Sequence, residues 1–178
     1  PHCSSNPMID PLLVWIALAC TATLFAHAAV AKLSDRTLFA QHLAAYGLPH
    51  GLLPGAVWLI PLAEAATAVA LLTPARAWGA AAAAALLLAY GAVMAWHRAH
   101  GRRLDCGCGG EPLPLSWALV VRNAGLAVLA LLAGAPMAPR PLSLADFLVI
   151  AAALVLATLL HAALHQMLRH RARLSYRS

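Results

Sequence analysis

The chain has 178 residues, of which 62% are hydrophobic and only 10% are charged. A soluble domain carries about 25% charged residues, so this composition argues against a soluble enzyme domain and for a membrane protein. The formal net charge of +6 calls for no nucleic-acid partner. Basic residues that lie beside the anionic headgroups of a lipid bilayer account for it.

Five apolar stretches approach the roughly 20 residues that a bilayer-spanning helix needs. They cover residues 12–31, 52–73, 78–96, 115–135 and 142–164. A soluble bundle would show polar faces at helical spacing, whereas residues 78–96 carry no charge on any face. We therefore predict an all-α, polytopic membrane helical bundle of about five transmembrane helices, a four-helix core plus one.

The composition leaves room for one transmembrane domain, over residues 8–168. Met8 directly precedes the first apolar run, so residues 1–7, with Cys3, are expected to be an added or disordered N-terminus. Residues 169–178 are expected to form a basic cytoplasmic tail. No resident cofactor is expected.

Basic residues are distributed unevenly between the two sides of the predicted bundle, because successive connections alternate sides. Nine fall on one side: Lys32, Arg36, Arg98, Arg102, Arg103, Arg169, Arg171, Arg173 and Arg177. Only Arg76 and Arg140 fall on the other. The positive-inside rule then places the N-terminus outside and the C-terminus in the cytoplasm, with the third connection on the cytoplasmic side.

Residues 34–46 are too polar to cross a membrane, yet Leu38, Phe39, Leu43 and Tyr46 recur at helical spacing. This pattern predicts a short amphipathic helix at the interface. Ser34 is the expected N-cap of this helix.

The second predicted span contains Glu64, near the middle of the membrane. An ionisable residue at such a depth is a functional candidate by default, and its partner must be named. Arg122 is the expected partner, because it is the only arginine within a span. Together with Asn123, these residues form either a structural network or a proton or ligand site. The structural interpretation is favoured, since buried ion pairs are often structural.

The third connection carries Cys106-Gly107-Cys108 in a segment rich in glycine, proline and charge. Two thiols at this spacing can form a strained, easily reduced disulfide, and labile disulfides are the regulatory or catalytic ones. Arg102 and Arg103 would favour the thiolate. Purely structural cysteines are the alternative. A quinone-linked oxidase, a variant of the redox hypothesis, would need an apolar pocket with a polar end.

A metal site is a less favoured alternative, since thiolates together with imidazoles suit copper or zinc. Five histidines are expected near the same end of the bundle: His27, His97, His100, His161 and His165. The candidate ligands are Cys106, Cys108, His97, His161 and His165. Interfacial anchoring of helix ends explains these histidines equally well.

The chain resembles the MauE family, membrane components of methylamine-utilisation clusters that are related to DoxX-type membrane proteins. The residues that carry the resemblance are Ala31-Lys32-Leu33, Phe39, Tyr46-Gly47-Leu48-Pro49, Pro61-Leu62-Ala63-Glu64, Cys106-Gly107-Cys108 with Gly110, Ser116-Trp117 and Arg122-Asn123. Their order and spacing are more specific than any one of them.

The resemblance implies a bacterial inner-membrane protein, a component of a thiol–disulfide redox system, that supports maturation of methylamine dehydrogenase. The small subunit of that enzyme carries many disulfides, and the implied partner is MauD, a thioredoxin-like protein facing the periplasm. Cys106 and Cys108 would be the redox pair that exchanges with the partner, and Cys20 a less favoured resolving thiol.

The implied client is periplasmic, whereas the charge count places the cysteine loop on the cytoplasmic side. Three alternatives reconcile the two. The protein relays electrons across the membrane, with Cys106 and Cys108 at the inner side; it acts as a scaffold with structural cysteines; or it has the opposite orientation. The last is ranked lowest, because it places nine positive charges outside.

Overall fold

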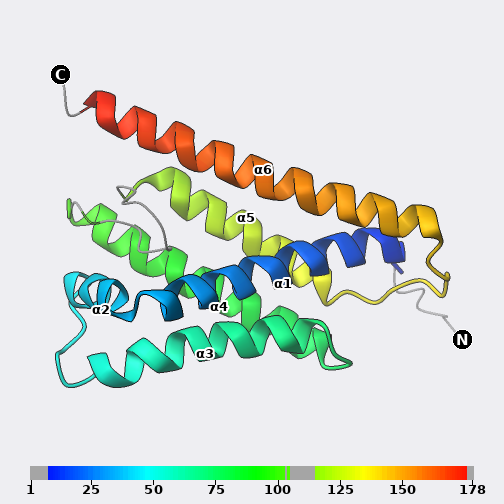
Figure 1. The fold of residues 1–178 in the computed structure, drawn as a ribbon, viewed down its shortest axis with the longest axis horizontal. Coiled ribbons are helices and arrows are strands. Elements are labelled where there is room, and N and C mark those ends of the chain that lie inside the picture. The colour runs from blue at the N-terminus through cyan, green and yellow to red at the C-terminus, as the bar shows by residue number, and fades with distance from the viewer. Residues whose placement is uncertain (1–7, 103, 105–114, 176–178) are drawn as a thin grey trace, which may run out of the picture.

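The computed structural model describes residues 8–102, 104 and 115–175, and these form six helices (Figure 1). The helices are α1 (Pro11–Ser34), α2 (Arg36–Ala45), α3 (Leu53–Leu71), α4 (Arg76–Ala99), α5 (Trp117–Ala133) and α6 (Leu144–Ser175). Residues 1–7 lie outside the described part. Residues 169–175, expected to be part of a tail, continue α6.

Four of the described helices are long and apolar enough to cross a membrane: α1, α3, α4 and the Leu144–Leu164 part of α6. The fifth long element, α5, is equally apolar but has 17 residues. All five run side by side along the long axis of the molecule, and α2 lies at one end (Figure 1). The predicted polytopic membrane helical bundle with a short additional helix is confirmed.

The core lies between α1, α3, α4 and α5. The most extensive packing is between α4 and α5, followed by that between α1 and α3, and α1 also packs against α5. Large apolar side chains such as Leu59, Val69, Val121 and Val128 point outward instead. In lipid such exposure has no hydrophobic cost, so the bundle presents an apolar surface to the bilayer.

Helix α6 packs against α1, and within its most apolar stretch, Leu144–Leu164, only Asp146 in the first turn is buried among the described side chains. Its first turn is held by Arg140, which bonds Asp146 at 2.9 Å and Asp10 at 3.0 Å. The hydrogen bond from Arg140 lowers the pKa of the Asp10 carboxyl, and the two carboxylates raise the pKa of Arg140. This cluster therefore ties the start of α6 to the start of α1.

Helix α2 follows α1 almost directly. Asp35, rather than the predicted Ser34, is its N-cap, since the carboxylate accepts a hydrogen bond from the Leu38 amide at 2.9 Å. Ser34 instead ends α1 and donates its hydroxyl to the Val30 carbonyl. Gly47, with a φ of 87°, then turns the chain away from α2, a conformation that glycine adopts without strain.

Helix α4 lies close against the end of α3 at Gly79. A Cβ added there would lie 2.7 Å from the Leu71 nitrogen and 2.9 Å from the Ala70 carbonyl carbon, both backbone atoms. The absence of a side chain thus sets how tightly α4 folds back against α3, as small residues do at helix contacts in membranes.

Gly79→Ala is expected to lower the stability of the bundle by about 1–3 kcal/mol, because backbone atoms must shift to admit the new methyl group. Gly125→Ala is the matched control, since nothing lies within 4 Å of the position of its Cβ. The measurement is the thermal unfolding transition of both variants in detergent. Equal transitions for the two would contradict the packing role of Gly79.

Candidate functional site

A buried ion pair joins three helices at the centre of the candidate site. The Lys32 Nζ of α1 donates to both carboxylate oxygens of Glu64 on α3, at 2.6 and 2.8 Å. The Tyr90 hydroxyl of α4 donates to Glu64 Oε1 at 2.8 Å. The side chains of Lys32 and Glu64 are only 9% and 1% exposed, so the pair is almost fully removed from solvent.

The prediction that Arg122 is the partner of Glu64 is wrong, because the hydrogen bonds of the Glu64 carboxylate are with Lys32 and Tyr90. Lys32 lies in the last turn of α1, which extends three residues beyond the predicted end of the first span at residue 31. Its ammonium therefore lies inside the bundle rather than in a connection. Arg122 and Asn123 lie on α5, and Asn123 is buried.

A cavity of about 380 Å³ opens beside this ion pair. Its lining comes from five helices and the turn after α2: Lys32, Phe39, His42, Leu43, Tyr46, Gly47, Leu48, Ile60, Tyr90, Val93, Met94 and Asn123. Most of these side chains are apolar or aromatic. The volume falls in the range of about 300–1,000 Å³ that is usual for small-molecule sites.

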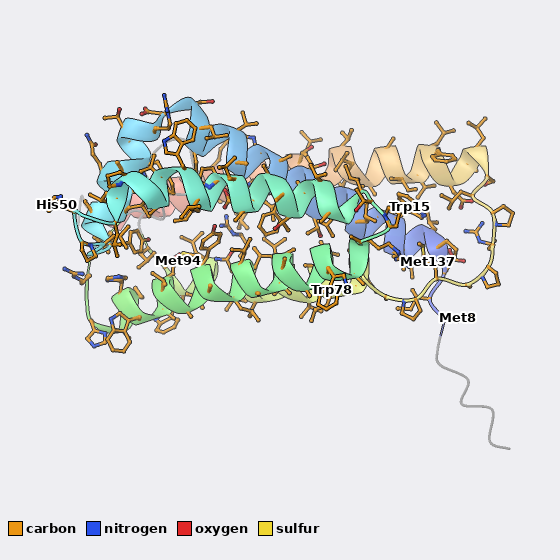
Figure 2. The ribbon with its side chains drawn as sticks, turned by 90° about the horizontal axis from the view of Figure 1, so that it is seen from below. Met8, Trp15, His50, Trp78, Met94 and Met137 are labelled. Carbon is orange, nitrogen blue, oxygen red and sulfur yellow. The ribbon has the colours of Figure 1, made fainter. Side chains whose placement is uncertain are left out.

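The cavity lies in the half of the bundle that ends at α2. Figure 2 shows its lining residue Met94 in the half toward His50, whereas Trp15, Trp78 and Met137 lie in the other half. Glu64 holds both Lys32 and Tyr90 at the cavity wall, so one carboxylate orients two lining side chains.

Cys106 and Cys108 lie outside the described residues, but the two ends of their segment are described. The Leu115 amide donates to the Leu104 carbonyl at 2.8 Å, which closes the base of the loop. Leu115 is buried with Met94 and Leu119 in a small cluster against which Tyr46 and Tyr90 pack. The loop therefore begins and ends next to the residues that line the cavity.

The other predicted site residues lie apart from one another. Cys20 is a free, half-buried thiol in the middle of α1. His97 is buried on α4 against the Tyr46 ring at 5.0 Å, and its Nδ1 lies 3.3 Å from an Arg102 nitrogen. His161 is on the outer helix α6. Within the described ranges no three His, Cys, Asp or Glu side chains gather to hold a metal.

Comparison with known proteins places these features in a family. The family model "Methylamine utilisation protein MauE" matches residues 9–136, which include α1 to α5 and end before α6. The chain belongs to the MauE family.

Two curated relatives carry the same name. The Methylamine utilization protein MauE of Paracoccus denitrificans is 40% identical over 129 residues, 70% of this chain and 69% of the relative. That of Paracoccus versutus is 39% identical over 143 residues, 77% of each chain. No solved structure matches the chain significantly. This MauE-family chain is therefore a multi-pass membrane protein of methylamine utilisation.

Sequence reasoning missed Lys32 and Tyr90 as site residues. Lys32 stands only one residue after the first apolar stretch, and the helical register that continues through Leu33 could have placed it on the inner face of α1. Tyr90 has a clearer signal, because it is the only side chain with a hydroxyl in the uncharged stretch 78–96. A polar group at that depth needs a hydrogen-bond partner.

Removing one member of the ion pair is expected to cost more than removing both. Glu64→Gln leaves the Lys32 charge buried without a counter-charge, so stability should fall by about 3–5 kcal/mol. The double variant Lys32→Met with Glu64→Gln should recover a large part of that loss. Thermal or denaturant unfolding in detergent measures both. Additive losses from Lys32→Met and Glu64→Gln would contradict the pairing.

Proposed function

We propose that this MauE-family chain is the membrane component of a thiol–disulfide system in which Cys106 and Cys108 form the redox pair. The observation that carries the proposal is the Cys-Gly-Cys segment itself, in a loop whose base is closed by the Leu104–Leu115 hydrogen bond at one end of the bundle.

The proposed partner is a thioredoxin-like protein of the MauD type, and the proposed client is the small subunit of methylamine dehydrogenase. In the exchange a thiolate of one protein attacks the disulfide of the other, through a mixed disulfide. One S–S bond forms as another breaks, so two electrons pass between the proteins and the protons follow the thiols. The chain would thereby support disulfide formation during maturation of the client.

The proposed location is the bacterial inner membrane, with the N-terminus outside and the C-terminus in the cytoplasm. Because Lys32 belongs to α1, it no longer counts among the charges of the connections. Eight basic residues then remain on the predicted cytoplasmic side, against two on the other side. The eight are Arg36, Arg98, Arg102, Arg103, Arg169, Arg171, Arg173 and Arg177. The bias is therefore still strong enough to support this orientation.

A scaffold that holds the thioredoxin-like partner without exchanging thiols is the second candidate. The observation that favours this candidate is the network of Lys32, Glu64 and Tyr90, which links three helices by an ion pair and hydrogen bonds. This network holds the bundle together without a reactive group. Copper or zinc binding by Cys106, Cys108, His97, His161 and His165 ranks below both, because His97 is already packed against Tyr46 and Arg102.

Cys106→Ser and Cys108→Ser are each expected to stop the partner from cycling between its dithiol and disulfide forms, because a single remaining thiol cannot close the internal disulfide. Alkylation of the partner's free thiols followed by a gel-shift assay in cells measures the cycling. Membrane levels of the variants should match the unmodified protein.

Cys20→Ser is the matched control and should leave the cycling unchanged, since Cys20 lies in the middle of α1. Normal cycling in both loop variants, with co-purification of the partner preserved, would replace the redox proposal with the scaffold.

The orientation predicts that a membrane-impermeant thiol reagent labels Cys106 and Cys108 in inverted vesicles but not in intact spheroplasts, after reduction. Comparison with and without the reductant gives the redox state of the pair in the same experiment. Labelling in spheroplasts alone would place the loop in the periplasm and overturn the orientation.

A further inference from the structure

The cavity beside Lys32 holds polar groups that the ion pair leaves unused. An ammonium group has three N–H donors, and Lys32 directs two of them to Glu64. Asn123 is only 4% exposed and lines the cavity, yet its amide makes no hydrogen bond within the described part of the chain. Because this amide lines the cavity, it can donate a hydrogen bond to a ligand group that enters there and accept one from it.

The remaining wall of the cavity is mostly apolar, with Phe39, Leu43, Ile60, Val93 and Met94 around those polar groups. Its other polar side chains are His42, Tyr46 and Tyr90. The Lys32 charge is compensated by Glu64 at 2.6 Å, so the site offers no surplus positive charge at that point. An anionic headgroup or fatty acid would bury an uncompensated negative charge there, which is expensive. The chemistry therefore selects a neutral ligand with oxygen acceptors and an apolar body.

We propose that this cavity binds the ring of a membrane quinone. A quinone ring is neutral and flat and carries two carbonyl oxygens, which accept hydrogen bonds from the third N–H of Lys32 and from the Asn123 amide. The aromatic rings of Phe39 and Tyr90 supply faces on which such a ring packs. A quinone is dissolved in the bilayer, so it reaches a cavity in a membrane-spanning bundle without crossing water.

A quinone would also supply the oxidant for the thiol pair, and this link alone rests on the proposed function. Two S–H bonds break and one S–S bond forms, and the two electrons and two protons convert the quinone to its quinol. The packing of Leu115, at the base of the cysteine loop, against Met94 and Tyr90 brings the end of that loop to the cavity wall. Binding to the cavity itself does not depend on the cysteines.

The test uses the full chain purified in detergent and a photoreactive azidobenzoquinone with a short isoprenoid tail. Labelled peptides are mapped by mass spectrometry, with decylubiquinone and oleate as separate competitors. We expect labels on peptides of α2 and α4 that decylubiquinone displaces and oleate does not. Asn123→Leu and Leu43→Trp should each raise the quinone concentration needed for displacement about tenfold or abolish the label.

Leu156→Trp is the matched control, because Leu156 is 58% exposed on the outer face of α6, and it should label like the unmodified protein. A thermal unfolding scan checks that each variant is folded. If Asn123→Leu does not fold, the labelling of Leu43→Trp decides the test. The Cys106→Ser/Cys108→Ser double variant should keep the label even where thiol exchange fails. Labels spread over α6, equal displacement by oleate, or unchanged labelling of both cavity variants would overturn the proposal.

Discussion

The ion pair between Lys32 and Glu64 fixes the relation of α1 to α3, and Tyr90 extends it to α4. A charge buried without its partner in the bilayer costs several kcal/mol, so any slip of α1 along α3 that parts the two groups is strongly disfavoured. Apolar packing alone would be less selective, because apolar helices in lipid gain little from one register over another. The pair thus sets the register on which the site depends.

The consequence extends to α2, because α2 begins only two residues after α1 ends. With Lys32 held in place and Asp35 capping α2, the direction of that short helix is nearly determined. Phe39 and Leu43 of α2 then become one wall of the cavity. In the opposite half of the bundle, other contacts fix the positions of the helices. There the backbone contact at Gly79 and the Arg140 cluster hold the helices, with no buried ion pair in the described part of that half.

Hydropathy predicted the ends of α1, α3, α4 and α5 and the start of α6 to within a few residues, because a membrane-spanning helix needs an uninterrupted apolar run that few other structures contain. It missed the polar continuation of α6 from residue 164 to Ser175. The same criterion failed at Lys32. It ends a span at the first charge, whereas the hydrogen-bonded helix continues to Ser34 and turns that charge inward. The error removed Lys32 from the candidate partners of Glu64 and left Arg122. Charge and depth can show that Glu64 needs a partner, but helix rotation decides which cation faces it.

The cavity was beyond sequence reasoning for a related reason: its wall is assembled from five helices, and no single segment carries its pattern. Yet all its described lining residues, from Lys32 to Asn123, fall within residues 9–136, the part that the MauE family model matches. Helix α6 lies outside that part, contributes no described residue to the lining and is attached through α1 and the Arg140 cluster. The site is therefore a property of the α1–α5 core, and α6 supports the outside of α1 without shaping the cavity.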